Sequence, residues 1–276
     1  MKFILLRLVI AVLLTLGFFA VAVIIPPSGI PVLNYHQIND EDENLLTVST
    51  TEFETQMAWL EENGYHAITA AELADALEGR ANLPERPVLI TFDDGYVDNY
   101  TCAFPILKKH GMKATIFIIS EYVSLYPNYL TWEQLLEMQL HGIDFGSHTV
   151  DHNVLTELSP NSVNHELADS KRTLETQLGR RVEFLAYPCG FTNEAIKARV
   201  AATGYRGAFT VELGNTHPGD DLYALNRVPI FGAMPHTMFR FIGRLQCPRL
   251  AAWLENVQRS LIRSGYSGLA EIMPAI

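Results

Sequence analysis

Short apolar runs alternate with amphipathic stretches along most of this chain. The runs predict buried strands, which begin near positions 32, 88, 114, 143, 183 and 207, with one more over 225–230. Between most of these strands, apolar residues recur with helical spacing. Strands that alternate with helices in this way are typical of a parallel sheet, either a closed barrel or a doubly wound open sheet.

Capping residues and glycines mark the ends of the predicted helices. Ser49 followed by Glu52 has the form of a capping box, and Gly64 ends that helix. Thr131 caps a second helix, which Gly142 closes. Further helices are expected over residues 103–110, 162–178, 193–202 and 250–265. Because the last of these carries its apolar residues on one stripe, we expect an amphipathic C-terminal helix.

The beginning of the chain is a separate apolar segment. Residues 8–25 carry no charge, and Lys2 and Arg7 precede them. A helix of about 18 residues spans roughly 27 Å, close to the hydrocarbon thickness of a bilayer. The positive residues then predict that the remainder of the protein lies outside the cytoplasm.

A cleaved signal peptide is the alternative for this segment. Ala20-Val21-Ala22 has the small-x-small form of a cleavage site, but the residues after it are still apolar. We therefore expect residues 1–27 to be a retained membrane anchor and residues 28–276 to be the functional domain. In both cases the functional domain is exported.

Composition excludes some partners. With 276 residues, of which 48% are hydrophobic, the chain is long enough for one large core. Its formal net charge is −11 and no block of Lys or Arg stands out, so nucleic acid is not an expected partner. Cys102, Cys189 and Cys247 are scattered and lack the CxxC spacing of a thiolate zinc site, and we expect them to be unpaired. The oligomeric state cannot be predicted from these features.

Two short polar segments directly follow apolar runs. The first is Thr91-Phe92-Asp93-Asp94-Gly95 and the second is Ser147-His148-Thr149-Val150-Asp151-His152. Both stand at predicted strand ends, where parallel α/β folds place their chemistry. If the second segment is helical, its two histidines lie on one face, as two imidazoles that share a metal ion require.

An aspartate of the first segment can complete such a metal site. Adjacent side chains at a strand end point in different directions, so one aspartate can bind the ion while its neighbour accepts a proton. The alternative for an Asp-Gly pair is an ordinary turn. The preceding strand and the histidine pair favour the metal site, and hence a metal-assisted hydrolase.

Together the two segments resemble the first two motifs of the polysaccharide deacetylase family, the NodB-homology carbohydrate esterases. The resemblance covers residues 31–230. It implies a distorted (β/α) barrel and one divalent metal ion, usually Zn²⁺ with Co²⁺ or Ni²⁺ as alternatives. The implied ligands are Asp94, His148 and His152, and the implied general base is Asp93.

A third segment, Ala186-Tyr187-Pro188-Cys189-Gly190, resembles the third motif of the family. It implies that the backbone N–H of Tyr187 stabilises the developing oxyanion, and we assign Tyr187 and Pro188 to substrate binding. The arginine that many members carry just before this motif is absent, and Cys189 replaces an aromatic residue. The alternative is a rigid turn set by Pro188 and Gly190.

The opening Val32-Leu33-Asn34-Tyr35-His36 resembles the start of the poly-N-acetylglucosamine deacetylase branch. It implies that His36 is the general acid that protonates the leaving amine. His236 is the alternative, because other branches place this histidine late in the chain. Arg227 is also assigned to substrate binding. It either supports Asp93 through a direct contact with that carboxylate or forms a surface ion pair.

The resemblance implies a metal-dependent enzyme that removes N-acetyl groups from an N-acetylglucosamine-containing polysaccharide outside the cytoplasm and releases acetate. The expected partners are that polysaccharide and, through the N-terminal helix, a membrane. A non-catalytic glycan-binding protein on the same scaffold is the main alternative. Two histidines and a carboxylate also suit an iron oxygenase. A glycosidase is weaker, since adjacent carboxylates cannot flank a sugar ring.

Overall fold

The computed structural model describes residues 29–232 and 237–264. Gly29–Met238 form one compact unit, which contains Asp93, Asp94 and both histidines of the second polar segment. The described residues from Phe239 onward belong to a second unit. The predicted boundary between an anchor and one domain over 28–276 stays a prediction.

The strands of the larger unit are β1 (Val32–Tyr35), β4 (His66–Ile68), β5 (Pro87–Phe92), β6 (Ala114–Ile118), β7 (Ile143–Ser147), β8 (Phe184–Ala186), β9 (Gly207–Leu213) and β10 (Leu225–Pro229), with a small parallel pair β2 (Gln37–Ile38) and β3 (Thr47–Val48). Its helices are α2 (Thr50–Glu62), α3 (Ala70–Leu77), α4 (Phe104–Lys109), α5 (Trp132–Gln139), α6 (Pro160–Leu178) and α7 (Glu194–Ala202).

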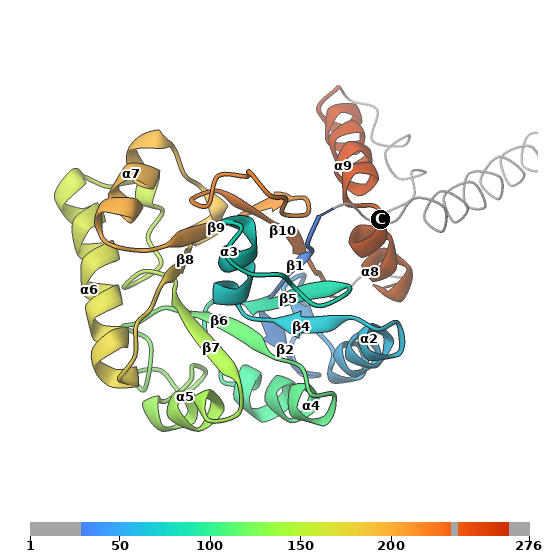
Figure 1. Cartoon of the computed structure of the whole chain (residues 1–276), viewed down its shortest axis with the longest axis horizontal. Coiled ribbons are helices and arrows are strands. Elements are labelled where there is room, and N and C mark those ends of the chain that lie inside the picture. Colours follow the sequence, from blue (N-terminus) through green and yellow to red (C-terminus); the bar gives the residue numbers. More distant parts are fainter. Residues whose placement is uncertain (1–28, 233–236, 265–276) are drawn as a thin grey trace, which may run out of the picture. The chain divides into compact units, whose positions relative to one another are not determined.

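Within residues 29–232, seven strands close into a parallel barrel in the order β1-β10-β9-β8-β7-β6-β5, and β5 returns to β1 (Figure 1). β1 therefore closes the ring, since Leu33 pairs with Val228 on one side and with Ile90 on the other. β4 adds to the first half of β5, on the edge that β6 occupies in the second half. The predicted (β/α) barrel is confirmed.

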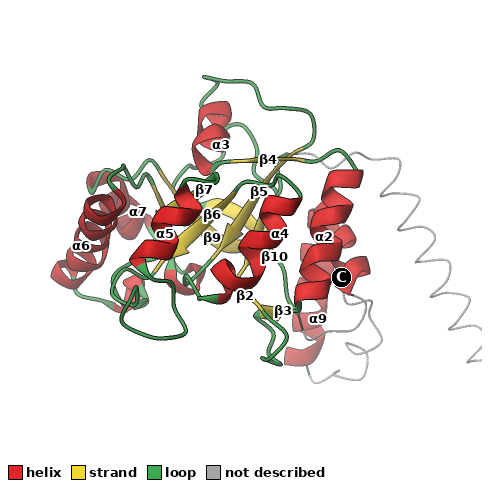
Figure 2. Cartoon of the chain, turned by 90° about the horizontal axis from the view of Figure 1, so that it is seen from below, coloured by secondary structure: helices red, strands yellow, loops and turns green. Residues whose placement is uncertain are grey.

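Helix α3 lies at the amino-terminal end of the barrel, as the turned view in Figure 2 shows. Its apolar residues join the inward-facing residues of the strands in one buried cluster, namely Val32, Ile68, Ala70, Leu73, Ala74, Leu89, Phe117, Phe184, Ala186, Phe209 and Leu225. Because this end is filled, the carboxyl ends of the strands at the opposite end are left for chemistry.

The apolar pattern does not predict β4 and α3. β4 has three residues, of which His66 is exposed, so it lacks a continuous apolar run. A local signal for α3 does exist, because Thr69 and Glu72 form a complete capping box immediately before the apolar Leu73.

The second unit contains most of α8 (Thr237–Gln246) and all of α9 (Pro248–Arg263). An ion pair between Arg244 and Glu255 joins the two helices. α9 coincides with the helix predicted over 250–265, whereas α8 is not predicted.

The predicted membrane anchor over residues 1–27 lies outside the described residues and stays a prediction. Over 29–232 and 237–264, no helix combines the length and the apolar character that a bilayer span requires. Cys102, Cys189 and Cys247 are free thiols.

His110, at the end of α4, links that helix to α2. Its Nδ1 lies 2.6 Å from Glu61 Oε2 and its Nε2 lies 3.0 Å from Glu54 Oε1. Partial burial opposes the imidazolium charge, but the two carboxylates outweigh it and raise the pKa of His110 above the ordinary histidine value. The ion pairs therefore stabilise the fold fully below about pH 6.5, and this stability is lost as the pH rises through the raised pKa.

We expect the free energy of unfolding to fall by about 0.5–1 kcal/mol more in the wild-type protein than in His110→Gln when the pH is raised from about 6 to about 9. Urea denaturation at both pH values measures this difference. His165→Gln is the control, because His165 pairs with one carboxylate, Asp169, on an exposed surface. Equal pH dependence in wild-type and His110→Gln protein would contradict the expectation.

Candidate active site

Asp94, His148 and His152 converge at the carboxyl end of the barrel. Asp94 Oδ1 lies 3.4 Å from His148 Nε2 and 3.6 Å from His152 Nε2. His148 and Asp94 are buried, whereas the side chain of His152 is 31% exposed. In the described part of the chain, this is the one group of three His, Cys, Asp or Glu side chains whose ligand atoms could hold a metal ion.

The spacing of these ligand atoms fits a zinc-like ion. With metal–ligand bonds of about 2.0–2.2 Å, the atoms at the corners of a tetrahedron lie about 3.3–3.6 Å apart. The two measured separations fall in this range. Three protein ligands also leave a fourth position for water or substrate, as in catalytic zinc sites.

His148 is held in the orientation that a ligand needs. It follows β7, its backbone N–H donates to Ile118 O, and its Nδ1 lies 2.8 Å from Ala186 O. A carbonyl oxygen accepts, so Nδ1 carries the proton and the Nε2 lone pair faces Asp94. Burial opposes a charge on this ring, but Asp93 and Asp94 raise the pKa of His148, so protons compete with a metal ion for Nε2.

The segment between the two histidines is a loop, so the helical arrangement considered for the pair is not the one that brings the two rings together. Thr149 and His152 have left-handed backbones with φ of 71° and 66°, and the next helical turn begins at Leu155. His152 N–H donates to Thr149 Oγ1 at 3.1 Å. The imidazole rings nevertheless meet with their centroids 4.7 Å apart, because the loop folds back on itself.

The two adjacent aspartates point in different directions, as expected at a strand end. Asp94 has a φ of 74° and turns towards the histidines. Asp93 instead faces Arg227, which is 0% exposed and comes from β10. Arg227 Nη1 donates to Asp93 Oδ1 at 2.8 Å and Nη2 donates to Oδ2 at 2.7 Å.

Arg227 therefore supports Asp93, and the alternative of a surface ion pair is wrong. Its assignment to substrate binding is wrong too, because the guanidinium is buried and its Nε donates to Thr210 O at 2.7 Å. Burial alone would disfavour the charged carboxylate, but the positive charge of Arg227 holds the pKa of Asp93 well below its ordinary value. Arg227 thus supplies from β10 the positive charge that the altered third motif lacks.

His36 stands beside Asp93 at the end of β1. Its Nε2 lies 4.0 Å from Asp93 Oδ2, and its side chain is 17% exposed. Burial is the main reason why the pKa of His36 is lowered, although Asp93 and Asp94 act in the opposite direction. His236 lies outside the described residues, so the choice between the two histidines as general acid stays a prediction.

Tyr187 does not offer a free backbone N–H, so its predicted role as an oxyanion donor is wrong. Its N–H donates to Phe209 O at 3.0 Å and continues the pairing of β8 with β9. Its side chain is buried, and its hydroxyl donates to Tyr223 O. Pro188 is also buried and begins a short 3₁₀ turn, in which Cys189 is exposed with a φ of 56°. This geometry agrees with the alternative of a rigid turn.

Two buried polar residues near the site are not predicted from the sequence. Asn34, in the apolar strand β1, donates to Asp93 Oδ2 at 3.1 Å. Glu166, on α6, accepts the backbone N–H groups of Val150 and Asp151. Asn34 leaves a signal in the sequence, since it is a polar residue within an otherwise apolar strand, whereas the buried face of α6 carries Ser170 as well as Glu166.

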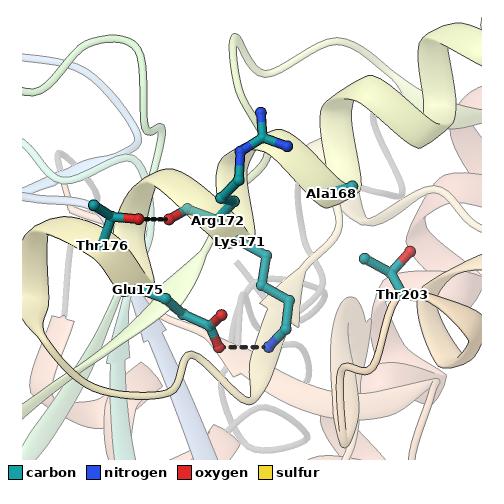
Figure 3. Close-up of a pocket in the computed structure, with 6 residues that line it drawn as sticks. All are labelled: Ala168, Lys171, Arg172, Glu175, Thr176 and Thr203. Atoms are coloured by element: carbon teal, nitrogen blue, oxygen red, sulfur yellow. Dashed lines mark hydrogen bonds and ion pairs between the residues drawn. The ribbon is translucent and has the colours of Figure 1, made fainter.

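A separate cavity of about 430 Å³ lies along α6 and does not include any metal-ligand candidate (Figure 3). Lys171 Nζ and Glu175 Oε1 in its wall form an ion pair at 2.9 Å, and Thr176 Oγ1 donates to the backbone of Arg172. Arg172 Nη2 pairs with Asp169 Oδ1 at 2.7 Å, so the charged groups of this wall already have partners on α6, and we do not treat the cavity as a candidate site.

Comparisons with known proteins agree with this geometry. A sequence model described as polysaccharide deacetylase matches residues 80–208, which include both aspartates and both histidines. The chain is 41% identical over 213 residues to YxkH of Bacillus subtilis (strain 168), whose name assigns it to the polysaccharide deacetylases, and the match covers 77% of this chain and 75% of that protein.

Further relatives share most of their length with this chain. It is 29% identical over 223 residues to the poly-beta-1,6-N-acetyl-D-glucosamine N-deacetylase of Staphylococcus epidermidis, with 71% of this chain and 77% of that protein covered. Among solved structures, the Streptococcus pyogenes deacetylase PplD in complex with acetate is similar, with a TM-score of 0.73 and 32% identity. That match covers 78% of this chain and 99% of that one.

Proposed function

Because the chain belongs to the polysaccharide deacetylase family, we propose that it is a metal-dependent hydrolase of N-acetyl groups. Its substrate would be an N-acetylglucosamine-containing polysaccharide outside the cytoplasm. The observation that carries the proposal is the Asp94–His148–His152 group with Asp93 directly beside it. A glycan-binding protein would need neither a converging ligand set nor a second, arginine-held carboxylate.

Asp94, His148 and His152 would hold the divalent ion, with Zn²⁺ as the first choice and Co²⁺ or Ni²⁺ as alternatives. Such an ion supplies Lewis acidity, which polarises the acetamide carbonyl and lowers the pKa of water. The proton transfers would be carried out by side chains of the protein.

Asp93 would accept the proton of the attacking water. Its low pKa keeps it ionised at neutral pH, and Arg227 and Asn34 fix both of its oxygens. The same pairing makes Asp93 a weak base that does not retain a proton. His36 lies 4.0 Å from Asp93 and would carry the proton to the amine as the C–N bond breaks. Acetate and a glucosamine unit are then released.

The name of the Staphylococcus epidermidis relative favours poly-β-1,6-N-acetylglucosamine as the polymer. Peptidoglycan and chitin-like oligomers are the alternatives, since all carry the same acetamide. An extracytoplasmic location, through an anchor over residues 1–27, is part of the same proposal.

We expect the purified full chain to release acetate from β-1,6-linked N-acetylglucosamine oligomers only when metal is bound. Chelation should reduce the rate at least about 100-fold, and Zn²⁺, Co²⁺ or Ni²⁺ should restore it, because the Lewis acid contributes several kcal/mol. Acetate release is measured on β-1,6 and β-1,4 oligomers and on peptidoglycan.

The matched variants are His148→Ala, which removes a ligand, and His66→Ala, which removes an exposed histidine on β4. His148→Ala should lose activity and metal together, and His66→Ala should keep both. Equal activity of stripped and reconstituted protein would refute metal dependence. One bound metal per chain without acetate from any polymer would favour the glycan-binding alternative.

A further inference from the structure

The loop that carries His152 does not have an intrinsically favourable backbone. Thr149 and His152 are both left-handed, a conformation that residues other than glycine rarely adopt. Such a conformation persists only where the surroundings enforce it. The contacts around the loop therefore decide where the imidazole of His152 lies.

His152 depends on its backbone more than His148 does. The Nδ1 of His148 donates to Ala186 O, which orients that ring directly. No described residue makes a comparable hydrogen bond to the second ring nitrogen of His152, and the side chain is partly exposed. The imidazole of His152 can face Asp94 only if the loop holds its backbone in place.

The loop is fixed from two sides. On one side, the carbonyl oxygens of Thr149 and Val150 accept hydrogen bonds from the backbone N–H groups of Ser120 and Glu121 at 3.1 and 3.0 Å. On the other side, Val150 N–H and Asp151 N–H both donate to the same carboxylate oxygen, Glu166 Oε2, at 2.8 and 3.3 Å. Successive N–H groups that converge on one anion form an anion-binding concavity.

Burial of the Glu166 carboxylate is energetically unfavourable. Glu166 is 2% exposed, on the face of α6 that also buries Val163 and Leu167. Within the described ranges, no Lys, Arg or His forms an ion pair with it, and Asn153 adds only a 3.4 Å hydrogen bond. A buried carboxylate without a counter-charge destabilises a fold unless hydrogen bonds compensate. Burial and the neighbouring Asp151 carboxylate raise the pKa of Glu166, whereas the N–H groups of Val150 and Asp151 favour its charged form, which ties the carboxylate to the loop.

We propose that Glu166 is a positioning residue for the metal centre. By accepting the N–H groups of Val150 and Asp151, its carboxylate keeps the loop in the conformation that turns His152 towards Asp94. The inference rests on the proposed function of this group as a metal site. It adds a residue from α6 to a site otherwise formed by residues at the ends of β5 and β7.

The test measures the dissociation constant of Zn²⁺ by competition with a chromophoric chelator, in full-length protein and without substrate. Glu166→Ala should raise this constant about 10- to 100-fold, the usual effect of losing a residue that orients a metal ligand. Glu166→Gln should stay within a few-fold of wild type, because its amide oxygen can still accept both N–H groups.

The matched control is Glu175→Ala on the same helix (Figure 3). Glu175 Oε1 also accepts a backbone N–H, that of Val182 at 3.0 Å, but outside the histidine loop. Its removal should lower stability without changing the dissociation constant of Zn²⁺. Glu166→Asp is the second variant in case Glu166→Ala does not fold; it keeps the charge but withdraws the carboxylate from the loop, and should weaken Zn²⁺ binding about 10-fold.

Unchanged Zn²⁺ binding in folded Glu166→Ala or Glu166→Asp would overturn the role of Glu166 and leave the proposed function intact. A similar loss in Glu175→Ala would also overturn it, since the effect would then be general destabilisation. Wild-type protein that binds no Zn²⁺ would contradict the proposed function itself.

Discussion

Replacement of Arg227 by methionine is expected to lower the free energy of unfolding by about 3–5 kcal/mol, the usual cost of removing one partner of a buried ion pair. Asp93 is 2% exposed and would be left as a buried charge without its cation. Urea denaturation near neutral pH measures the change. Acetate release should fall as well, because Asp93 loses the group that orients both of its oxygens.

The sign of the pH dependence provides a check on this cause. In the wild-type protein the lowered pKa of Asp93 stabilises the fold above the ordinary aspartate pKa, and this contribution is lost as the pH falls through the lowered value. In Arg227→Met, protonation of Asp93 removes the unpaired charge, so the stability deficit should shrink as the pH is lowered.

The double variant Arg227→Met/Asp93→Asn separates the ion pair from simple loss of packing. It should recover part of the stability lost in Arg227→Met, since no unpaired charge remains, but it should stay inactive. A double variant that is less stable than Arg227→Met would show that packing of the arginine, rather than the unpaired carboxylate, causes the loss. Arg227→Lys should also lose stability and acetate release, because an ammonium group cannot form the bidentate pair with Asp93.

Replacement of Asp93 by asparagine is expected to reduce kcat by about 10²- to 10⁴-fold, the usual contribution of a general base, while one metal ion per chain is retained. Asparagine keeps a carbonyl oxygen that accepts from Arg227, but it leaves the buried guanidinium without its counter-charge, so Asp93→Asn should also lower the free energy of unfolding, and kcat is compared on protein shown to be folded. Metal content and acetate release, measured on the same preparation, test both parts.

The matched control for Asp93 is Asp144→Asn. Asp144 is a largely buried aspartate on β7 that also pairs with an arginine, Arg180, at 2.6 Å. Because it lies near the amino-terminal end of its strand, its loss should leave kcat within a few-fold of wild type. Comparable losses of kcat in both variants would mean that disruption of any such ion pair impairs activity, and Asp93 would lose its role as base.

The metal group could be predicted from the sequence because it depends on strand ends. Asp94 and His148 each lie one or two residues beyond the end of a strand, and carboxyl ends of parallel strands meet at one end of a barrel. The loop between the histidines could not be predicted, since a spacing of four residues suits a helix as well as a folded-back loop. Thr149 and His152 have left-handed backbones, but neither is a glycine, so the sequence gives no sign of this conformation.

Contacts that depend on strand register or on strands distant in the chain could not be predicted from the sequence. Arg227 lies 134 residues after Asp93, and only closure of the barrel decides that it points inward. Whether the N–H of Tyr187 is free depends on how β8 pairs with β9, and that register places Phe209 O in reach. Apolar patterns specify which face of a strand is buried, but they do not specify which neighbour each backbone group meets.

The closing position of β1 sets an order of assembly for the site. β1 comes early in the chain, yet it pairs with β10, which follows all the other strands of the barrel. Contacts so distant in sequence form late, because a long loop must close before they contribute stability. Asp94 follows β5 and the histidines follow β7, and these two strands are joined through β6 alone. We therefore expect the folding chain to become able to capture metal before Arg227, on β10, reaches Asp93. Catalytic competence would then be the last property that the domain acquires.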